Sequence, residues 1–359
     1  MRPIPFSMSR YPPQKRIAVA LSGGIDSAVA AALLKEEGCD IFALHMLIPT
    51  DDMAVCAEKA GAVARRLNIP FYTVDVEKPF SEEVIHYFID EYLRGRTPNP
   101  CVVCNRQIKL GVLLERALSL GAEKIATGHY ARVIYNEEAG RFILRKGSDR
   151  AKDQSYFLCT LSQEQLARIL LPLGEMSKTE ARDYASRIRL KDLSERESQE
   201  VCFIPHGDYK EFLRERIPPD MANSGDIVDT EGRIMGKHRG IFNFTIGQRR
   251  GLGLPDATPF YVLGFNIEKK QVIIGKKEDL YRQDCMVEKI NWVSTREITQ
   301  ALKVKTRIRY KHREAPAILT SVDAATVRVR FQEPQKAITP GQVAVFYKGD
   351  VVVGGGFIA

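Results

Sequence analysis

The chain lacks the segments that would place it in a membrane or export it from the cell. No stretch of its 359 residues reaches the ~18 consecutive apolar residues of a membrane-spanning helix, and residues 1–16 contain no apolar core of the ~7–15 residues that a signal peptide needs. We therefore expect a cytoplasmic protein with no membrane partner. A hydrophobic content of 44% over this length predicts two or three domain cores.

Cysteine is scarce, and its pattern argues against two common structural uses. The seven cysteines are an odd number in a chain expected to be cytoplasmic, which argues against a disulfide framework. The single CxxC has no second CxxC or histidine pair at zinc-finger spacing, which argues against a four-ligand zinc site. Three cysteines lie within apolar helix or strand patterns and are interpreted as small core residues: Cys39, Cys56 and Cys159. Three others lie outside such patterns: Cys101, Cys104 and Cys202.

The first half of the chain alternates predicted strands and helices. A short apolar run at residues 16–21 stops at a Ser-Gly-Gly sequence, and a stretch rich in helix formers follows it. Further strands are predicted in IFALHM, FYTVDV and KIATGH, separated by amphipathic helical patterns. This alternation predicts an α/β domain with a doubly wound parallel sheet. Its ligand would lie beyond the carboxyl ends of the strands, where Ser22, Met46 and Gly128 fall.

The first domain is expected to continue through a hairpin and two helices, and the texture of the sequence changes near residue 207. A hairpin is predicted at residues 131–147, followed by two helices, the second opened by a capping box of Ser177 and Glu180. Short β-rich runs separated by turns then dominate, as in VAVFYKGDVVVGGGFIA. We predict three domains: a catalytic α/β domain over residues 1–207, a small connector domain over 208–278 and a C-terminal β-barrel over 279–359.

The sequence SGGIDS at residues 22–27 lies between the first predicted strand and the first predicted helix. Its glycines permit close backbone approach, the amides of a helix N-terminus attract an anion, and Ser22 and Ser27 add hydroxyl groups. The loop lacks the lysine of a Walker A motif, which indicates release of pyrophosphate rather than transfer of a γ-phosphoryl group. Asp26 is expected to hold Mg²⁺. An ordinary glycine turn would explain an isolated Ser-Gly-Gly, but the strand-loop-helix context favours a nucleotide site.

A second motif, RTPNPCVVCNRQIKL at residues 96–110, combines a rigid turn with two cysteines. Its prolines restrict the turn, and Cys101 and Cys104 precede a helical pattern that begins around Asn105. A cysteine beside a helix N-terminus and a basic side chain carries more of the nucleophilic thiolate. Cys202 lies far along the chain, in a predicted loop between elements.

Positive charge is concentrated in two places, although the net charge is only +8. KVKTRIRYKHR has a cation at every second residue, so on one strand all of these cations would face one side and form a track for phosphates. They are Lys303, Lys305, Arg307, Arg309, Lys311 and Arg313. The alternative is a solvated edge strand protected by charge. In GQRRGLG, Arg249 and Arg250 adjoin glycines that allow close approach to a phosphate backbone, and together the two features favour RNA as the partner.

Several motifs occur in the order found in one enzyme family. SGGIDS resembles the signature of the PP-loop ATPases, the N-type ATP pyrophosphatases. With RTPNPCVVCN, ATGHYAR, KDQSYFL, VCFI, TIGQRRGLG, RIRY and PGQVAVFY, the chain resembles the tRNA-specific 2-thiouridylases (MnmA family) from about Arg16 to its C-terminus. The resemblance implies a tRNA-uridine 2-sulfurtransferase that splits ATP into AMP and pyrophosphate and replaces the C2 oxygen of the wobble uridine with sulfur. It also implies that the C-terminal barrel binds tRNA.

The resemblance further assigns residues. The nucleophile falls on Cys104 and the persulfide-bearing cysteine on Cys202. The implied ATP contacts are Ala20, Leu21, Ser22, Gly23, Gly24, Ile25, Asp26, Ser27, Met46 and Gly128. The implied tRNA contacts are His129, Lys152, Asp153, Gln154, Arg309, Tyr310 and Gln342, with Asn99, Pro100 and Cys101 facing the target base. Many members carry Asp where this chain has Cys101, which puts an acid/base role at that position in doubt.

Two routes for the sulfur remain open. In one, a persulfide on Cys202 attacks the adenylated carbon and Cys104 then frees the product sulfur, which leaves a Cys104–Cys202 disulfide. This route needs an upstream sulfur donor, either a persulfide protein or sulfide, and a reductant. In the other, Cys101, Cys104 and Cys202 hold a [4Fe–4S] cluster with one iron open to an extra sulfide.

Two other classes of function fit parts of the sequence. A different PP-loop ligase, which delivers ammonia or an amine, has no need of Cys104 and Cys202. A non-catalytic RNA-binding module would release neither AMP nor pyrophosphate in the presence of tRNA.

Overall fold

The computed structural model describes residues 16–50, 52–190, 201–204, 207–218, 224–254 and 258–359. The chain forms two units, one made of the residues up to Phe80 with Cys104–Phe203, the other of Ser81–Val103 with Ile204–Ala359. Each unit is thus assembled from two separate stretches, and the boundaries of the three predicted domains stay a prediction. Among the described helices, none combines the length and the apolar character that crossing a bilayer requires.

The first unit contains the predicted parallel sheet. Five strands lie in the order β3-β2-β1-β4-β7, and all neighbouring pairs are parallel. Their bounds are β1 Arg16–Ala20, β2 Asp40–Leu47, β3 Phe71–Asp75, β4 Lys124–Ala126 and β7 Ile169–Leu170. The strand order reverses at β1, because β2 and β4 lie on its two sides. Such a reversal is where ligands bind in open α/β sheets, and it confirms the predicted fold class.

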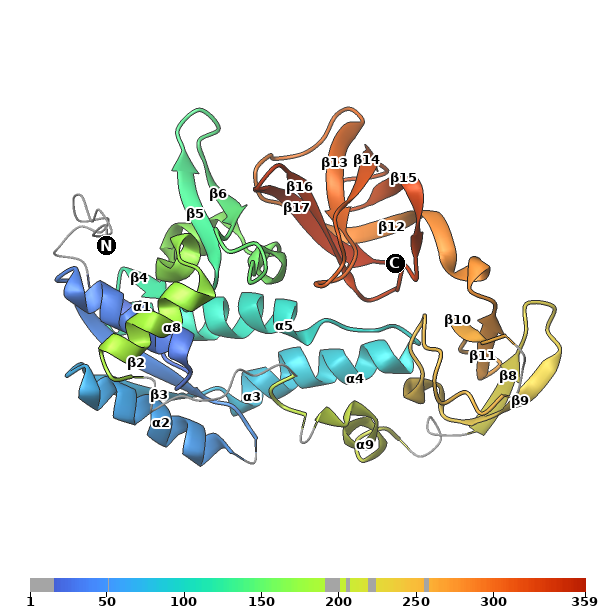
Figure 1. The fold of residues 1–359 in the computed structure, drawn as a ribbon, viewed down its shortest axis with the longest axis horizontal. Helices are drawn as coiled ribbons and strands as arrows, with labels where there is room; N and C mark the ends of the chain where they lie inside the picture. Colours follow the sequence, from blue (N-terminus) through green and yellow to red (C-terminus); the bar gives the residue numbers. More distant parts are fainter. Residues whose placement is uncertain (1–15, 51, 191–200, 205–206, 219–223, 255–257) are drawn as a thin grey trace. The chain divides into compact units, whose positions relative to one another are not determined.

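Apolar helices pack against this sheet. α1 (Ile25–Glu36) is buried along most of its length and packs Ala31 and Leu34 near Ile17 and Val19 of β1. α8 (Lys178–Arg187) lies beside α1 and opens with the predicted capping box (Figure 1). The other helical elements are α2 Met53–Arg66, α3 Glu77–Phe80, η2 Cys104–Val112, α6 Leu113–Ser119, η3 Ser155–Leu158, α7 Gln163–Arg168 and η4 Pro172–Glu175. The predicted hairpin is present as β5 Ala131–Asn136 and β6 Arg141–Lys146.

The helix that carries the CxxC cysteines begins earlier than predicted. It starts with α5 (Pro100–Val103) and continues directly into the π-helical η2 and then α6. The predicted start at Asn105 was therefore wrong. A proline suits the first helical position because its missing N–H would have no partner there. Cys104 consequently lies inside the helix, one turn from its start.

The second unit contains a small four-stranded sheet. Its strands lie in the order β10-β11-β8-β9, and Val262, Val272 and Ile274 are buried in its core. The strand bounds are β8 Ser224–Val228, β9 Ile234–Arg239, β10 Tyr261–Asn266 and β11 Gln271–Gly275. The helical elements of this unit are η1 Ser81–Ile85, α4 His86–Leu93, α5, α9 Tyr209–Arg214, η7 Ile241–Asn243 and η8 Glu278–Leu280.

The same unit ends in the predicted β-barrel. Six antiparallel strands follow the order β12-β15-β14-β13-β16-β17, and pairing of β12 with β17 closes the barrel. The bounds are β12 Tyr281–Trp292, β13 Leu302–Arg307, β14 Ala315–Ser321, β15 Val327–Lys336, β16 Val343–Lys348 and β17 Val351–Ile358. Alternate residues such as Val327, Val329 and Phe331 point into the barrel core, as the period of two requires.

The cationic stretch of the barrel does not form one strand, contrary to the prediction. β13 ends at Arg307, and residues 308–314 turn the chain back so that Thr306 pairs with Ala315 of β14. Arg307 forms an ion pair with Glu314 at 3.0 Å, which ties the two ends of this turn. Lys303 and Lys305 therefore share one exposed strand face, whereas the exposed cations at 309, 311 and 313 belong to the turn.

Candidate active site

The phosphate loop, residues 22–27, joins β1 to α1 and is closed by its own serines. The Ser27 hydroxyl donates to the Gly24 carbonyl at 2.9 Å and lies 3.1 Å from the Ser22 hydroxyl. The amides of Ser22 and Gly24 donate back to the Ser27 and Ser22 hydroxyls, at 3.2 and 3.3 Å. Both serines thus shape the loop, and each hydroxyl lies at the start of α1, where a bound anion would be.

Gly23 and Gly24 make the loop possible. Gly23 has φ of +81°, and a Cβ there would lie 3.1 Å from the Lys59 Cβ and 3.2 Å from the Ala60 amide nitrogen of α2. Gly24 is the N-cap of α1 and offers no side chain to the first-turn amides. Those amides point out of the helix N-terminus, where they attract negative charge.

Neighbouring strand ends hold this loop, as the switch-point argument predicts. The Leu21 amide donates to the Leu44 carbonyl at 2.8 Å, and Nδ1 of His45 lies 2.8 Å from the Leu21 carbonyl oxygen. A Cβ on Gly128 would lie 2.7 Å from the Asp26 carbonyl carbon and 2.8 Å from the Ser27 nitrogen. Glycine is therefore required at 128 for the end of β4 to approach the start of α1 this closely.

The remaining predicted ATP contacts also lie at this edge of the sheet. Ala20 ends β1, Ile25 begins α1 and packs on its apolar core, and the partly exposed Met46 is the next-to-last residue of β2. The sequence-predicted nucleotide residues are thus gathered around one helix start. Their contact with ATP stays a prediction.

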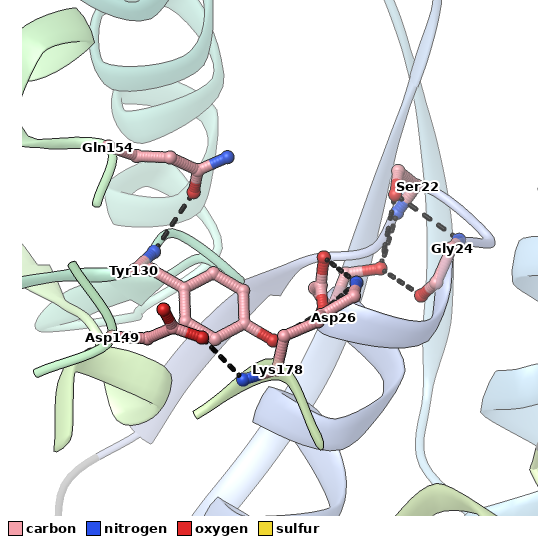
Figure 2. Close-up of polar contacts among 8 residues, drawn as sticks. Ser22, Gly24, Asp26, Tyr130, Asp149, Gln154 and Lys178 are labelled. Carbon is pink, nitrogen blue, oxygen red and sulfur yellow. Dashed lines mark hydrogen bonds and ion pairs between the residues drawn. The ribbon is translucent and has the colours of Figure 1, made fainter. Parts of the chain in front are cut away.

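Two residues that the sequence did not point to meet Asp26. The Tyr130 hydroxyl donates to Oδ1 of Asp26 at 2.8 Å, and Nζ of Lys178 lies 2.8 Å from both Asp26 carboxylate oxygens (Figure 2). Lys178 opens α8, 152 residues along the chain from Asp26. No local pattern could have revealed this partner, because the pair forms only when α8 packs beside α1.

The segment with the predicted tRNA contacts Lys152, Asp153 and Gln154 is tied to the same place. Gln154 contacts the Tyr130 backbone twice. Its side-chain Oε1 accepts from the Tyr130 amide at 2.9 Å (Figure 2), and its backbone amide donates to the Tyr130 carbonyl at 2.8 Å. Asp149 accepts from the Lys178 amide at 3.0 Å and, through its other oxygen, from the Lys152 amide at 3.3 Å. The segment is therefore connected to both partners of Asp26.

Asp153 and His129 do not carry the positive charge that a direct contact with a phosphate would need. Asp153 is buried, and its carboxylate accepts from the Gly147 and Ser155 amides at 3.1 Å each. Burial, with Lys109 as a second cause, lowers the pKa of His129 to about 3, so its imidazole is neutral at physiological pH. Its Nδ1 lies 2.8 Å from the Thr127 hydroxyl. Both residues shape the site, and their contact with tRNA stays a prediction.

Cys104 is buried at the start of the π-helical η2. The side-chain amide of Gln165, on α7, donates to the carbonyls of Arg106 and Leu110 at 2.7 Å each. A Cβ at position 111 would lie 3.2 Å from the Arg106 carbonyl oxygen, and Gly111 avoids this close contact. The wide turn that follows Cys104 is therefore held by a side chain from another helix. π-helical turns of this kind are frequent at functional sites.

Cys202 is exposed in a short turn, and its neighbour Phe203 anchors that turn. Phe203 is buried and packs edge-on against Phe80, with ring centroids 5.6 Å apart. Within the part of the chain that the structure describes, no three His, Cys, Asp or Glu side chains form a metal-binding group. The alternative of a [4Fe–4S] cluster on Cys101, Cys104 and Cys202 is therefore not favoured.

The predicted base-facing and barrel residues both belong to the second unit. Nε2 of Gln342 donates to the carbonyls of Thr97 and Pro98 at 3.0 and 3.2 Å, directly before Asn99 and Pro100. Arg309 is exposed, with one guanidinium nitrogen 3.4 Å from the Lys336 carbonyl oxygen, and Tyr310 beside it is half-buried. Gln342 therefore positions the turn that the sequence assigns to the target base.

Three family models match the chain. The model described as tRNA methyl transferase HUP domain matches residues 15–206, more than half of the chain. The tRNA methyl transferase PRC-barrel domain matches residues 210–276, and the aminomethyltransferase beta-barrel domain matches residues 282–358.

Curated relatives match over nearly their whole length. The chain is 47% identical over 355 residues to tRNA-specific 2-thiouridylase MnmA 1 of Caldanaerobacter subterraneus, with 96% of this chain and 97% of that protein covered. It is 48% identical over 351 residues to the MnmA protein of Syntrophotalea carbinolica, with 96% and 99% covered. For the protein of Clostridium acetobutylicum the identity is 41% over 355 residues, again with 96% and 99% covered. The chain belongs to the tRNA-specific 2-thiouridylase (MnmA) family.

Proposed function

We propose that this protein replaces the C2 oxygen of the wobble uridine of tRNA with sulfur, at the expense of ATP. The observation that carries the proposal is the end-to-end match to relatives named tRNA-specific 2-thiouridylases, in a chain whose phosphate loop lies at the switch point of its sheet. Two family models are described as methyl transferases instead. A loop of amides and hydroxyls at a helix start suits a polyphosphate, which supports ATP-dependent thiolation.

The first step activates the uridine oxygen. The C2 oxygen attacks the α-phosphorus of ATP, pyrophosphate leaves, and the carbon then carries AMP as a good leaving group. The phosphate loop would hold the polyphosphate through its amides and through Ser22 and Ser27. Asp26 is the carboxylate that would hold Mg²⁺, because this ion is commonly bound by one or two carboxylates together with phosphate oxygens and waters. When bound, the ion neutralises charge on the nucleotide.

The second step delivers sulfur. The terminal sulfur of a Cys202 persulfide bonds to C2, and AMP leaves with the original oxygen. The Cys104 thiolate then attacks the Cys202 sulfur, the bond to the transferred sulfur breaks, and its electrons remain on the product thiocarbonyl. A Cys104–Cys202 disulfide results, so an external two-electron reductant must restore both thiols. With both thiols restored, the outer sulfur comes from a persulfide protein, which passes it to the Cys202 thiolate; sulfide can supply it only by opening the Cys104–Cys202 disulfide at Cys202, a step that replaces the reductant.

Reconstitution tests this proposal. Full-length protein is incubated with ATP, Mg²⁺, unmodified tRNA and either a persulfide donor with a dithiol or, starting from the Cys104–Cys202 disulfide, sulfide without a dithiol. The digested tRNA is then analysed by mass spectrometry. We expect 2-thiouridine and AMP without any methyl donor, no product from Cys104→Ser or Cys202→Ser, and normal product from the control Cys56→Ser. A methylated or amidated nucleoside, or full thiolation by both variants, would overturn the proposal.

A further inference from the structure

Asp26 presents an electrostatic problem at a polyphosphate site. Its carboxylate lies in the first turn of α1, among the amides that attract anions, and its side chain is 32% exposed. A carboxylate there repels the phosphates that the loop is built to bind. The loop itself contains no lysine or arginine that could offset this charge.

Lys178 supplies the missing positive charge. Its ammonium is 2.8 Å from each Asp26 oxygen, and its side chain is only 8% exposed (Figure 2). An ammonium placed symmetrically between two carboxylate oxygens stands where a cation held by Asp26 would stand. The ring of Tyr130 lies 5.9 Å from the same ammonium and lines this position.

The backbone of Lys178 is fixed while its side chain is long enough to change partners. The Lys178 amide donates to Asp149 at 3.0 Å, and the capping box of Ser177 and Glu180 holds the start of α8. The ammonium ends a flexible four-carbon stem, so it can move by a few ångströms with the helix start in place. Exchange of one anionic partner for another therefore needs no rearrangement of the fold.

We infer that Lys178 is the phosphate-binding lysine of this site, and that it leaves Asp26 for the polyphosphate when the nucleotide binds. Asp26 then becomes available to the nucleotide's metal. The inference rests on the proposed use of ATP and adds a residue and an exchange of partners to it. Before the nucleotide binds, the ion pair neutralises the Asp26 carboxylate. After it binds, the Lys178 ammonium would face the polyphosphate and the Asp26 carboxylate would face the metal ion.

Equilibrium binding tests the exchange without tRNA, sulfur or turnover. The probe is α,β-methylene-ATP, which cannot be split between its α- and β-phosphates, titrated calorimetrically into full-length protein in EDTA or in Mg²⁺. We expect Lys178→Met to bind about 10- to 100-fold more weakly in EDTA, the range for loss of one charge-assisted hydrogen bond. Lys178→Arg should recover most of this loss, and Arg187→Met, a charge removal at the far end of α8, should change nothing.

Asp26→Asn separates the exchange from a purely structural ion pair. Because this variant removes the repulsive carboxylate, we expect it to bind the probe in EDTA as tightly as the wild type or more tightly, but to gain little from Mg²⁺. Adenosine, which has no phosphate, should bind all variants alike. Equal weakening by Lys178→Met and Asp26→Asn, together with equal losses of thermal stability, would overturn the inference.

The exchange of partners and the proposed function are contradicted by different results. Wild-type protein that binds the probe no better than the Lys178→Met variant contradicts the exchange alone. Wild-type protein that does not bind the probe at all contradicts the proposed use of ATP. Wild-type protein that binds the probe but never thiolates tRNA contradicts the proposed reaction and leaves the role of Lys178 intact.

Discussion

The side-chain amide of Gln165 lies 2.7 Å from the carbonyl oxygen of Arg106, inside the π-helical segment that begins at Cys104. Its second contact, to the Leu110 carbonyl, is equally short. The opposite end of the same side chain accepts from the Ser162 amide at 3.0 Å and completes the capping box of α7. One glutamine therefore connects the start of α7 to the helix of the proposed nucleophile.

We predict that Gln165→Glu slows thiolation roughly tenfold, since the loss of one or two hydrogen bonds costs about 1–2 kcal/mol. Glutamate keeps the capping acceptor but cannot donate to the two carbonyls, so the π-helical turn loses its support. Ser162→Ala is the matched control, because it removes the cap and costs about 1 kcal/mol of stability without touching η2. Rates of 2-thiouridine formation and melting temperatures distinguish the two variants. Equal thiolation rates for both would show that Gln165 only caps α7.

Gly128→Ala should abolish nucleotide binding. The new methyl group would lie under 3.0 Å from backbone atoms of Asp26 and Ser27, so either β4 or the start of α1 must move. Gly264→Ala is the control, because a Cβ at that position meets nothing within 4 Å. Calorimetric titration with α,β-methylene-ATP measures both. Binding by Gly128→Ala as tight as that of the wild type would show that the nucleotide does not depend on this contact.

Arg309→Ala should weaken tRNA binding at all salt concentrations and lower the slope of log affinity against log salt by about one, as loss of one phosphate contact predicts. Arg307→Ala should instead destabilise the barrel, because Arg307 is paired with Glu314 and is mostly buried. Filter binding at several salt concentrations and thermal melting separate these effects. An unchanged salt slope for Arg309→Ala would remove Arg309 from the RNA-binding surface.

Stability should fall as the pH drops below about 6.5, the unperturbed histidine pKa. Burial lowers the pKa of His129 to about 3 and also lowers that of His45, so below pH 6.5 the unfolded chain binds protons that the folded chain does not. The two histidines contribute their full stabilisation at pH values above their pKa in the unfolded chain. They lose it as the pH falls toward their lower pKa in the folded protein. Urea unfolding from pH 7 to pH 4 measures the loss, which His129→Gln should make shallower. An identical pH dependence for the variant would show that His129 titrates normally.

Local patterns were sufficient for much of this fold. The apolar run before Ser22, the turn glycines and the helix formers after Ser27 predict the strand, loop and helix that form, because each element follows from its own residues. The capping box at Ser177 is equally local. The α/β sheet and the C-terminal barrel followed from such elements taken together.

Long-range partners could not be predicted. Asp26 carries no signal for a lysine 152 residues away, and nothing in the sequence of η2 shows that Gln165 will hold its carbonyls. The alternating cations from Lys303 to Arg313 fit a strand as well as a strand and a turn. Pairing of β13 with β14 decided between them, because the chain must reverse before Ala315.

An oxygen tracer tests the central chemical claim most directly. tRNA whose wobble uridine carries ¹⁸O at C2 is treated with the protein, ATP, Mg²⁺ and a sulfur donor, and the released nucleotide is analysed by mass spectrometry. If the C2 oxygen attacks the α-phosphorus, each AMP formed with a 2-thiouridine carries one ¹⁸O atom. Unlabelled AMP with the label in water, or label in pyrophosphate or inorganic phosphate, would contradict activation of the uridine oxygen by adenylation.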